Sequence, residues 1–452
     1  MRKTVIILSV FVFIVGSCSI SRKIKREELK TVMTLNQSKA VTIGLAGSGT
    51  ATIDWGDGTK KETITLLEFS GSFTSARFTH DYSNPNTFHR TVTIYGQNIT
   101  HFSCINNSLT NLDVSDNTSL IFLDCWGNQL SELDVSKNNA LRELSCGANQ
   151  ITKLNVSNNS VLTHLECSSN KLTELDVSKS SALIYLDCAN NLLSELDVSK
   201  SGVLTILDCY NNQLKKLDVN NNRTLTELSC RNNQLTELDL SNNSVLTRLE
   251  CAENQLTELK LSNNIMLRDL DCWSNQLTAL DVSKNSELTR LLCFDNQLTV
   301  LDISKNSTLR ELDCWNNQLT ALDVSKNNRL IQLWCHNNQL EKLYVSGAAA
   351  LTVISCTNNL LTSLNVRNNP SLAYLSCANN LLSSNALDVL FGTLHDNDIF
   401  DGIITANPKF KTIFIARNPG ADNCNKYIAV DKGWNVNLEF NEDFTLIPFD
   451  TY

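Results

Sequence analysis

The sequence has few residues that break regular structure, and it has no excess of basic charge. Only 5 prolines and 16 glycines occur in 452 residues, which excludes a collagen-like or Pro/Gly-rich low-complexity chain. The formal net charge of −9 argues against nucleic acid as the main partner, because phosphate binding needs a basic face. Hydrophobic residues make up 42% of the chain, which is enough to exclude general disorder.

The patterns that carry catalysis are also missing. The six histidines have no metal-ligand or triad spacing, and the sequence contains no glycine-rich phosphate loop. Carboxylates are plentiful, and pairs of them can hydrolyse glycosides. However, a catalytic pair needs two unlike environments, and most of these carboxylates recur in a repeat. We therefore predict a protein that is not an enzyme and that uses no cofactor and no metal.

The N-terminal residues have the pattern of a targeting signal. A short basic start precedes the apolar run Val5–Val15, which is too short to span a bilayer as a mature helix. The sequence VGSC at residues 15–18 follows and resembles a bacterial lipobox. The resemblance implies that residues 1–17 are a signal peptide and that Cys18 carries a lipid anchor. The protein is then a lipoprotein of the cell envelope, anchored in the outer membrane and exposed at the surface. The alternative is a plain secretory signal cleaved near Ser17.

Two further segments precede the central region. Residues 18–31 are mostly polar and basic, and we expect a solvated tether that can touch anionic head groups. Residues 32–100 alternate apolar and polar side chains in short runs, which predicts antiparallel strands. The sequence WGDGT at 55–59, followed by HDY at 80–82 and a strand at 91–95, resembles a PKD-type β-sandwich. The acidic turn fits either a structural role, which we favour, or a calcium ion.

Fourteen cysteines recur at a constant step of 21 residues. Nearly all lie in the pattern Leu-x-x-Leu-x-Cys-x-x-Asn, and a similar half, mostly with Leu and Val, lies between successive cysteines. The series comprises Cys104, Cys125, Cys146, Cys167, Cys188, Cys209, Cys230, Cys251, Cys272, Cys293, Cys314, Cys335, Cys356 and Cys377. A fixed period of this length is the signature of a solenoid. The pattern resembles that of leucine-rich repeat proteins, with a short and nested unit.

The expected fold is mainly β. It is a leucine-rich repeat solenoid with parallel strands over residues 101–383, an N-terminal β-sandwich cap, and a mixed C-terminal cap over residues 384–452. Because both halves of the unit have the strand pattern, we expect strands on both faces and weak curvature. Within the C-terminal cap, we predict a helix over 385–393 and strands over 411–416 and 434–438. Cys424 lies outside the repeat series.

The cysteines and asparagines of the repeat have structural interpretations. Leu and Cys lie two apart in a strand, so both point inward, and like residues stack in columns along the solenoid. We predict buried, reduced thiols, because the strand spacing exceeds the Cβ–Cβ distance of a disulfide and the paired spacing of zinc ligands is absent. The asparagine three residues after each cysteine is expected to turn the chain and to bond backbone groups of neighbouring coils.

The residues that flank each cysteine point outward, and several of them are large aromatics or carboxylates. Such a patch is typical of a contact surface. Protein partners use aromatic anchors, whereas sugar rings lie on tryptophan faces beside carboxylates. The alternative is a ladder that only stabilises neighbouring strands. The predicted binding residues are Trp126, Tyr210, Asp271, Trp273, Phe294, Asp313, Trp315, Trp334 and His336.

A second acidic column, which includes Asp113, Asp239 and Asp323, lies in the other half of the unit, with lysines nearby. We interpret it as a soluble outer face, because the glycine-rich turns of calcium-binding β-helices are absent.

The leucine-rich repeat resemblance implies binding of a protein partner. Glycan capture for nutrition or adhesion, and a role as a structural spacer, are the alternatives.

Overall fold

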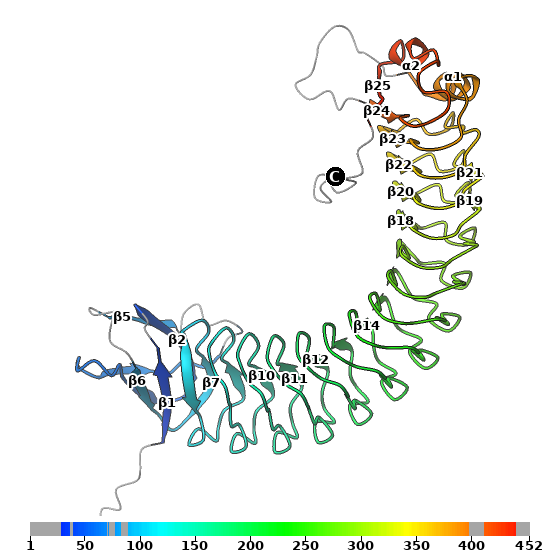
Figure 1. Cartoon of the computed structure of the whole chain (residues 1–452). Coiled ribbons are helices and arrows are strands. Elements are labelled where there is room, and N and C mark those ends of the chain that lie inside the picture. Colours follow the sequence, from blue (N-terminus) through cyan, green and yellow to red (C-terminus); the bar gives the residue numbers. More distant parts are fainter. Residues whose placement is uncertain are drawn as a thin grey trace, which may run out of the picture.

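The protein is an arc of stacked coils with a β-rich unit at one end and two helices at the other (Figure 1). A computed structural model describes residues 29–36, 39–69, 71, 77–82, 89–396 and 411–439. The predicted signal peptide, Cys18 and most of the predicted tether lie outside these residues.

The first half of each coil contributes one short strand to a long parallel sheet on the inner side of the arc (Figure 1). Each strand pairs in register with the strand of the next coil, so that Leu312 faces Leu291 and Leu333. These strands are β9 (Phe122–Asp124), β10 (Glu143–Ser145), β11 (His164–Glu166), β12 (Tyr185–Asp187), β13 (Ile206–Asp208), β14 (Glu227–Ser229), β15 (Arg248–Glu250), β16 (Asp269–Asp271), β17 (Arg290–Leu292), β18 (Glu311–Asp313), β20 (Gln332–Trp334), β22 (Val353–Ser355) and β23 (Tyr374–Ser376).

The interior consists of columns of identical side chains. All fourteen repeat cysteines are free thiols with no exposed surface, as the sequence predicted. They pack with leucines and valines in one continuous core. Burial raises the pKa of these thiols, for example that of Cys230 to about 12. The sulfurs therefore behave as small hydrophobic groups that fit a narrow interior.

Two residues make the turn after each strand: one takes the left-handed conformation and the next bonds the backbone. We expected the asparagine to have both roles. The left-handed position is the second residue after the cysteine, such as Asn232 (φ 50°) or Glu253 (φ 53°). The asparagine one residue later bonds the backbone instead. Asn254 donates to the carbonyls of Cys230 (3.0 Å), Cys251 (3.1 Å) and Ala252 (3.1 Å), and it accepts from the amide of Leu235 (2.9 Å). This side chain joins two coils with four hydrogen bonds.

The outer half of the coil is mostly irregular, so the expectation of strands on both faces was wrong. Among the described repeat coils after the first, only β19 (Ala321–Asp323) and β21 (Lys342–Tyr344) form strands there. Figure 1 shows an arc that curves clearly, with these two strands on its outer side. In a curved stack the outer segments are farther apart than the inner ones. Ladder hydrogen bonds therefore form mainly on the inner side.

The N-terminal unit contains two sheets that continue into the two sides of the first coil. One sheet has the order β4-β3-β6-β1-β8, and in the other β2 pairs with both β5 and β7. Strand β7 also pairs with β9, so the inner sheet runs from the cap into the solenoid without a break. The strands are β1 (Lys30–Leu35), β2 (Ala40–Gly47), β3 (Thr50–Asp54), β4 (Glu62–Thr65), β5 (Arg77–Asp81), β6 (Arg90–Tyr95), β7 (Ile99–Ser103) and β8 (Leu109–Asp113). Because β7 belongs to both parts, the boundary at residue 100 stays a prediction.

The two motifs of this unit contact each other. Asp57 accepts hydrogen bonds from Thr59 and lies 2.7 Å from Nε2 of His80, whose ring stacks on Trp55 at 4.9 Å. Burial raises the pKa of Asp57, but the hydrogen bonds from Thr59 and His80 outweigh it and hold the pKa below its usual range. Tyr82 donates to the carbonyl of Trp55 at 3.0 Å. These contacts give the acidic turn a structural role.

The C-terminal elements close the last coil. Helix α1 (Ser384–Thr393) begins after Ser383, whose side chain accepts a hydrogen bond from the amide of Ala386, and it buries Leu387, Leu390 and Phe391. Strands β24 (Lys411–Phe414) and β25 (Trp434–Asn437) extend the inner sheet, and the short helix α2 (Tyr427–Val430) lies between them in the chain. The helix and both strands that the sequence predicted here are present, although both strands are shorter than predicted.

Candidate binding surface

The outward side chains of the inner sheet form three columns along the concave face. They stand three residues before, one before and one after each cysteine. Between β9 and β18 these columns contain eleven carboxylates and three guanidinium groups. The carboxylates are Asp124, Glu143, Glu166, Asp187, Asp208, Glu227, Glu250, Asp269, Asp271, Glu311 and Asp313. The guanidinium groups are Arg231, Arg248 and Arg290. The concave face is therefore strongly acidic.

Consecutive aromatics in the third column stack on one another. The ring centroids are 5.0 Å apart for Trp273 and Phe294, 4.4 Å for Phe294 and Trp315, and 5.2 Å for Trp315 and His336. The planes differ by 8° to 12°, so the rings lie nearly parallel. At the start of the row, the guanidinium carbon of Arg231 lies 4.7 Å from the centroid of Trp273. We call the four rings of Trp273, Phe294, Trp315 and His336 the stacked row.

This geometry changes the role of the stacked row. A sugar ring binds by lying on a free aromatic face, and here the neighbouring rings and Arg231 already occupy faces of Trp273, Phe294 and Trp315. Each of these three side chains is only half-buried, so atoms at the ring edges remain accessible. The stacked row therefore acts first as a ladder between coils, and it offers a partner ring edges rather than faces.

Three of the predicted binding residues are buried, so our expectation that they are exposed was wrong. Trp334 is 8% exposed, His336 is 4% exposed and Asp313 is 7% exposed. Trp334 meets His336 edge-on at 6.4 Å, and the Nδ1 atom of His336 lies 3.4 Å from the hydroxyl of Ser355. On the inner side of an arc, neighbouring coils approach closely, and large adjacent side chains cover one another. Sequence columns alone do not show this crowding.

Trp126 and Tyr210 stand apart from the stacked row. Trp126 is 38% exposed, and among the described residues neither ring stacks on another aromatic ring. The next coil has Gly147 at the position where another aromatic would stand. The Trp126 indole lies against Gly147, where an added Cβ would approach its Cδ1 atom to 2.9 Å.

Some aspartates on the concave face hold their protons more tightly than usual. Burial raises the pKa of Asp208 to about 6, and neighbouring carboxylates add to the shift. Burial also raises the pKa of Asp271 to about 6, although Arg290 opposes it. The pKa of Asp313 rises to about 8 because of burial and the nearby Glu311. Asp313 has no hydrogen-bond partner for its Oδ1 atom, and the same holds for Asp271 Oδ1 and Glu311 Oε1.

A pocket of about 280 Å³ opens on the concave face between β12 and β15. It is lined by Asp187, Asp208, Tyr210, Glu227, Leu228, Ser229, Arg248 and Glu250. Of the predicted residues, only Tyr210 lines it. The pocket was not predicted, although the run of acidic residues before the cysteines of these coils is visible in the sequence.

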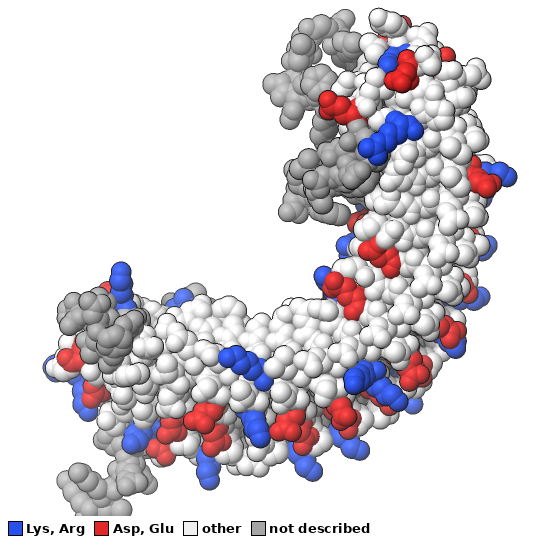
Figure 2. Space-filling view, viewed as in Figure 1, with Lys and Arg blue, Asp and Glu red and all other residues white. Residues whose placement is uncertain are grey.

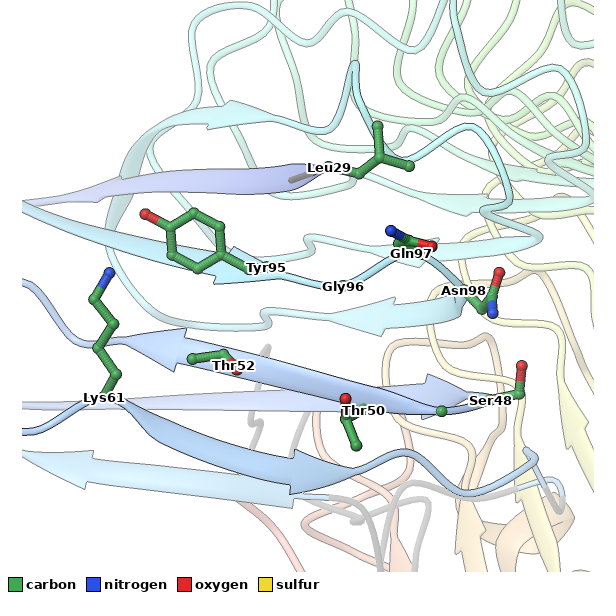
Figure 3. A pocket seen from close by; sticks show the side chains of 10 residues that line it. Leu29, Ser48, Thr50, Thr52, Lys61, Tyr95, Gly96, Gln97 and Asn98 are labelled. Carbon is green, nitrogen blue, oxygen red and sulfur yellow. The ribbon is translucent and has the colours of Figure 1, made fainter. Parts of the chain in front are cut away.

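A second pocket of about 410 Å³ lies in the N-terminal unit, beside β3 and β6 (Figure 3). Hydroxyl and amide groups line most of it, including Ser48, Thr50 and Asn98. Lys61 lies 4.7 Å from the ring centroid of Tyr95 and forms an ion pair with Asp54 at 3.2 Å. Its charge is therefore already paired, and we assign no ligand to this pocket.

The charged residues of the outer side have structural roles. Figure 2 shows lysines, arginines and carboxylates along the outer side of the arc. In the acidic column there, Asp239 accepts a hydrogen bond from the amide of Ser241 at 3.0 Å, and the other turns repeat this arrangement. The bond from Ser241 lowers the pKa of Asp239. Within the described part of the chain, no three potential ligands are grouped to hold a metal, and no helix is long and apolar enough to span a membrane.

Comparison with known proteins assigns the chain to a family. A family model for the LVIVD repeat matches residues 293–313, which is one coil. No curated protein sequence matches the chain. Among solved structures, the functional domain of InlJ from Listeria monocytogenes, described as including a cysteine ladder, is 36% identical with a TM-score of 0.60. The match covers 70% of this chain and 74% of that domain.

Two further solved structures are similar at lower identity. A leucine-rich repeat protein of Leptospira interrogans is 25% identical with a TM-score of 0.60, and the match covers 65% of this chain and 81% of that one. The leucine-rich effector YopM of Yersinia pestis is 27% identical with a TM-score of 0.50, and the match covers 59% and 73%. The repeat, the inner parallel sheet and the InlJ match together show that this chain belongs to the leucine-rich repeat family.

Proposed function

We propose that the protein is a non-catalytic binding protein that holds a protein partner on its concave face. Solenoids of this family are typical protein-interaction domains. The observation that carries the proposal is the stretch from β9 to β15, where Trp126 is exposed, Tyr210 is half-exposed and an acidic pocket opens. Exposed aromatics beside a polar pocket are typical of interface anchors.

The predicted binding residues then divide by accessibility. Trp126, Tyr210 and Asp271 contact the partner directly. The edges of Trp273, Phe294 and Trp315 flank the contact area. The remaining three residues are buried and do not contact the partner; they support the shape of the surface around the contact area. They are Asp313, Trp334 and His336.

Two alternatives remain as outcomes of experiments. Glycan binding needs a free ring face, which within the predicted set favours Trp126 and Tyr210 over the stacked row. A glycan array with tryptophan fluorescence tests it. A structural spacer should tolerate the deletion of two whole coils without loss of function, and loss of function would reject the spacer.

The location of the protein is part of the same proposal. We propose that Cys18 carries a lipid anchor and that residues 18–31 connect it to a PKD-like cap over residues 32–100. The solenoid would then stand at the outer membrane, with its concave face open to the cell surface. Replacing Cys18 with Ser should release the protein into the soluble fraction and abolish labelling by radioactive palmitate. Retained membrane association would reject the anchor.

Photo-crosslinking from matched positions tests the binding face. Tyr210 lies on the concave face and Tyr344, which is 50% exposed, lies on the outer side in β21. Each is replaced by p-benzoylphenylalanine, which preserves an aromatic ring at both sites. We expect a discrete cross-linked protein from position 210 and none from position 344. The same product from both positions, or only from position 344, would contradict the proposal.

A further inference from the structure

The concave face has two places where carboxyl groups outnumber the cations of the protein. One is the pocket between β12 and β15, where Asp187, Asp208, Glu227 and Glu250 surround a single guanidinium, that of Arg248. Arg248 bonds Glu250, and Ser229 donates to Glu250 at 2.9 Å. The other three carboxylates line the pocket, and within the described chain none of them forms an ion pair.

The second place is an acidic cluster on β16 to β18, formed by Asp271, Glu311 and Asp313. The nearest cation is Arg290, whose Nε atom bonds Glu311 at 3.2 Å. Asp313 is more than nine-tenths buried, and its Oδ1 atom has no hydrogen-bond partner. It lies within electrostatic reach of Glu311, Arg290 and Asp271. One buried oxygen of each of the three carboxyl groups accepts no hydrogen bond. Buried acceptors are normally paired, so the cluster can accept hydrogen bonds from N–H groups of a ligand.

The chemistry of the missing group follows from these acceptors. No three ligands in the described chain are grouped to hold a metal. An organic cation supplies both the N–H donors that these oxygens lack and a positive charge beside the carboxylates. Asp271 is partly exposed and the side chain of Glu311 is 22% exposed, so the cluster can be reached from the surface. A guanidinium has five N–H donors in a planar fork that matches carboxylates, which favours arginine over a point charge.

The distance between the two places sets the form of the partner. Asp208 on β13 and Asp271 on β16 stand in the same column, three coils apart. Three strand spacings amount to about 14 Å, which an extended chain spans in about four residues. Building on the proposed function, we propose that the concave face binds an extended segment of the protein partner with two arginines about four residues apart. One arginine enters the pocket and the other contacts the acidic cluster.

Binding of this segment should depend on pH. Asp208 faces Asp187, Glu227, Glu250 and Arg248, and Asp271 faces Glu250, Arg231 and Arg290. With a pKa of about 6 for both Asp208 and Asp271, these groups lose protons between pH 5 and 7. The arginine segment should therefore bind more tightly at pH 7.5 than at pH 5.5, with protons released on binding below neutral pH.

Synthetic peptides test the proposal without knowledge of the partner. A fluorescent peptide with the core Arg-Gly-Ser-Gly-Arg is compared with one in which the arginines are adjacent and with one in which both are glutamate. We measure fluorescence anisotropy at physiological salt. We expect the first peptide to bind about five-fold more tightly than the adjacent-arginine peptide, and the glutamate peptide not to bind.

Matched variants separate the site from the general charge of the protein. The double variant Asp208→Asn/Asp271→Asn should weaken binding of the spaced peptide about tenfold. The control Asp218→Asn/Asp239→Asn removes the same charge from the exposed outer column and should leave binding unchanged. The concave variant should melt at or above the wild-type temperature, because neutral amides replace carboxylates whose pKa values are raised in the fold. The outer variant should melt slightly below it, because Asp218 and Asp239 accept backbone hydrogen bonds as carboxylates.

The outcomes distinguish the inference from the proposed function. No binding of the spaced peptide, no preference for the spacing, or equal loss in the outer control would each overturn the arginine segment. If position 210 still cross-links a partner whose contact segment contains no basic residue, the proposed function stands and this inference falls. If cross-linking fails and the spaced peptide binds only through the concave carboxylates, the face takes a cationic segment but the protein-partner proposal loses its support.

Discussion

The two ends of the concave face contain the same kinds of residue but use them differently. From β16 to β20, aromatics occupy consecutive coils and stack, so their faces are covered, and Trp334 and His336 are buried. From β9 to β15, Trp126 and Tyr210 are separated by Gly147, Ser168 and Ala189, and an open pocket lies among carboxylates. Spacing within a column therefore decides whether an aromatic stabilises the solenoid or stays free to bind.

The largest expected difference between the two ends is in stability. Trp315→Ala removes a ring stacked between Phe294 and His336, and we expect the free energy of unfolding to fall by about 3 kcal/mol. Trp126→Ala removes a more exposed ring with no aromatic neighbour, and the loss should be below about 1 kcal/mol. Urea denaturation followed by circular dichroism measures both. Equal losses would remove the distinction between the two ends.

A second difference concerns pH. The pKa of Asp313 is about 8 in the folded protein and near 4 in an unfolded chain, so the folded state binds more protons between these values. Asp313 therefore contributes stability that is fully present below pH 4 and is lost as the pH rises through about 8. Asp313→Asn should remove this loss and stabilise the protein at pH 9 by on the order of 2 kcal/mol.

Urea titrations of wild type and Asp313→Asn at several pH values test this expectation. The gap in unfolding midpoint should widen steadily from pH 5 to pH 9. A gap that does not change with pH would show that Asp313 is ionised throughout. The outer-face variant Asp239→Asn, whose carboxyl has a lowered pKa, should show no gain at alkaline pH.

A smaller effect is expected where Trp126 lies against Gly147. In Gly147→Ala the new Cβ would approach the indole to 2.9 Å, so the ring should move outward. We expect Trp126 to become more accessible to acrylamide, with a cost in stability of about 1 kcal/mol or less. The fluorescence of Trp126 is isolated by comparison with Trp126→Phe. The control Gly202→Ala should have no effect, because the nearest atom to its Cβ is 3.9 Å away.

No difference is expected in the interior beneath the two ends. Cys146 lies under the open end and Cys293 under the stacked row, and burial raises the pKa of both thiols. A thiol reagent on the folded protein should leave all fourteen repeat cysteines unmodified, while the partly exposed Cys424 reacts. Mass spectrometry of labelled peptides gives the pattern. Selective labelling at one end would show that the two ends differ in the core as well.

The repeat made most of the fold predictable. The 21-residue step placed each cysteine and leucine inside, and the structure confirms these positions. The asparagine after each cysteine was correctly expected to bond neighbouring coils, but the left-handed residue is the one before it. A periodic sequence repeats one local environment, so the pattern of one coil holds for nearly all. Which of two adjacent polar residues takes the strained conformation depends on backbone geometry that composition does not reveal.

The candidate surface was less predictable. The columns of outward residues followed from the strand pattern, but the burial of Trp334, His336 and Asp313 did not. The acidic residues around Tyr210 are visible in the sequence, but the pocket that they line is not. The position of the Arg231 guanidinium on Trp273, two coils away, is not visible either. These features depend on how side chains from different coils meet on a curved surface.

By itself, the sequence determined the solenoid, its buried thiols and the residues that point outward, because side-chain alternation in a strand and a constant period leave little choice. Only the tertiary structure decided the curvature, the ring faces that are covered and the carboxylates that keep their protons. These depend on distances between coils, and such distances arise only when the coils stack.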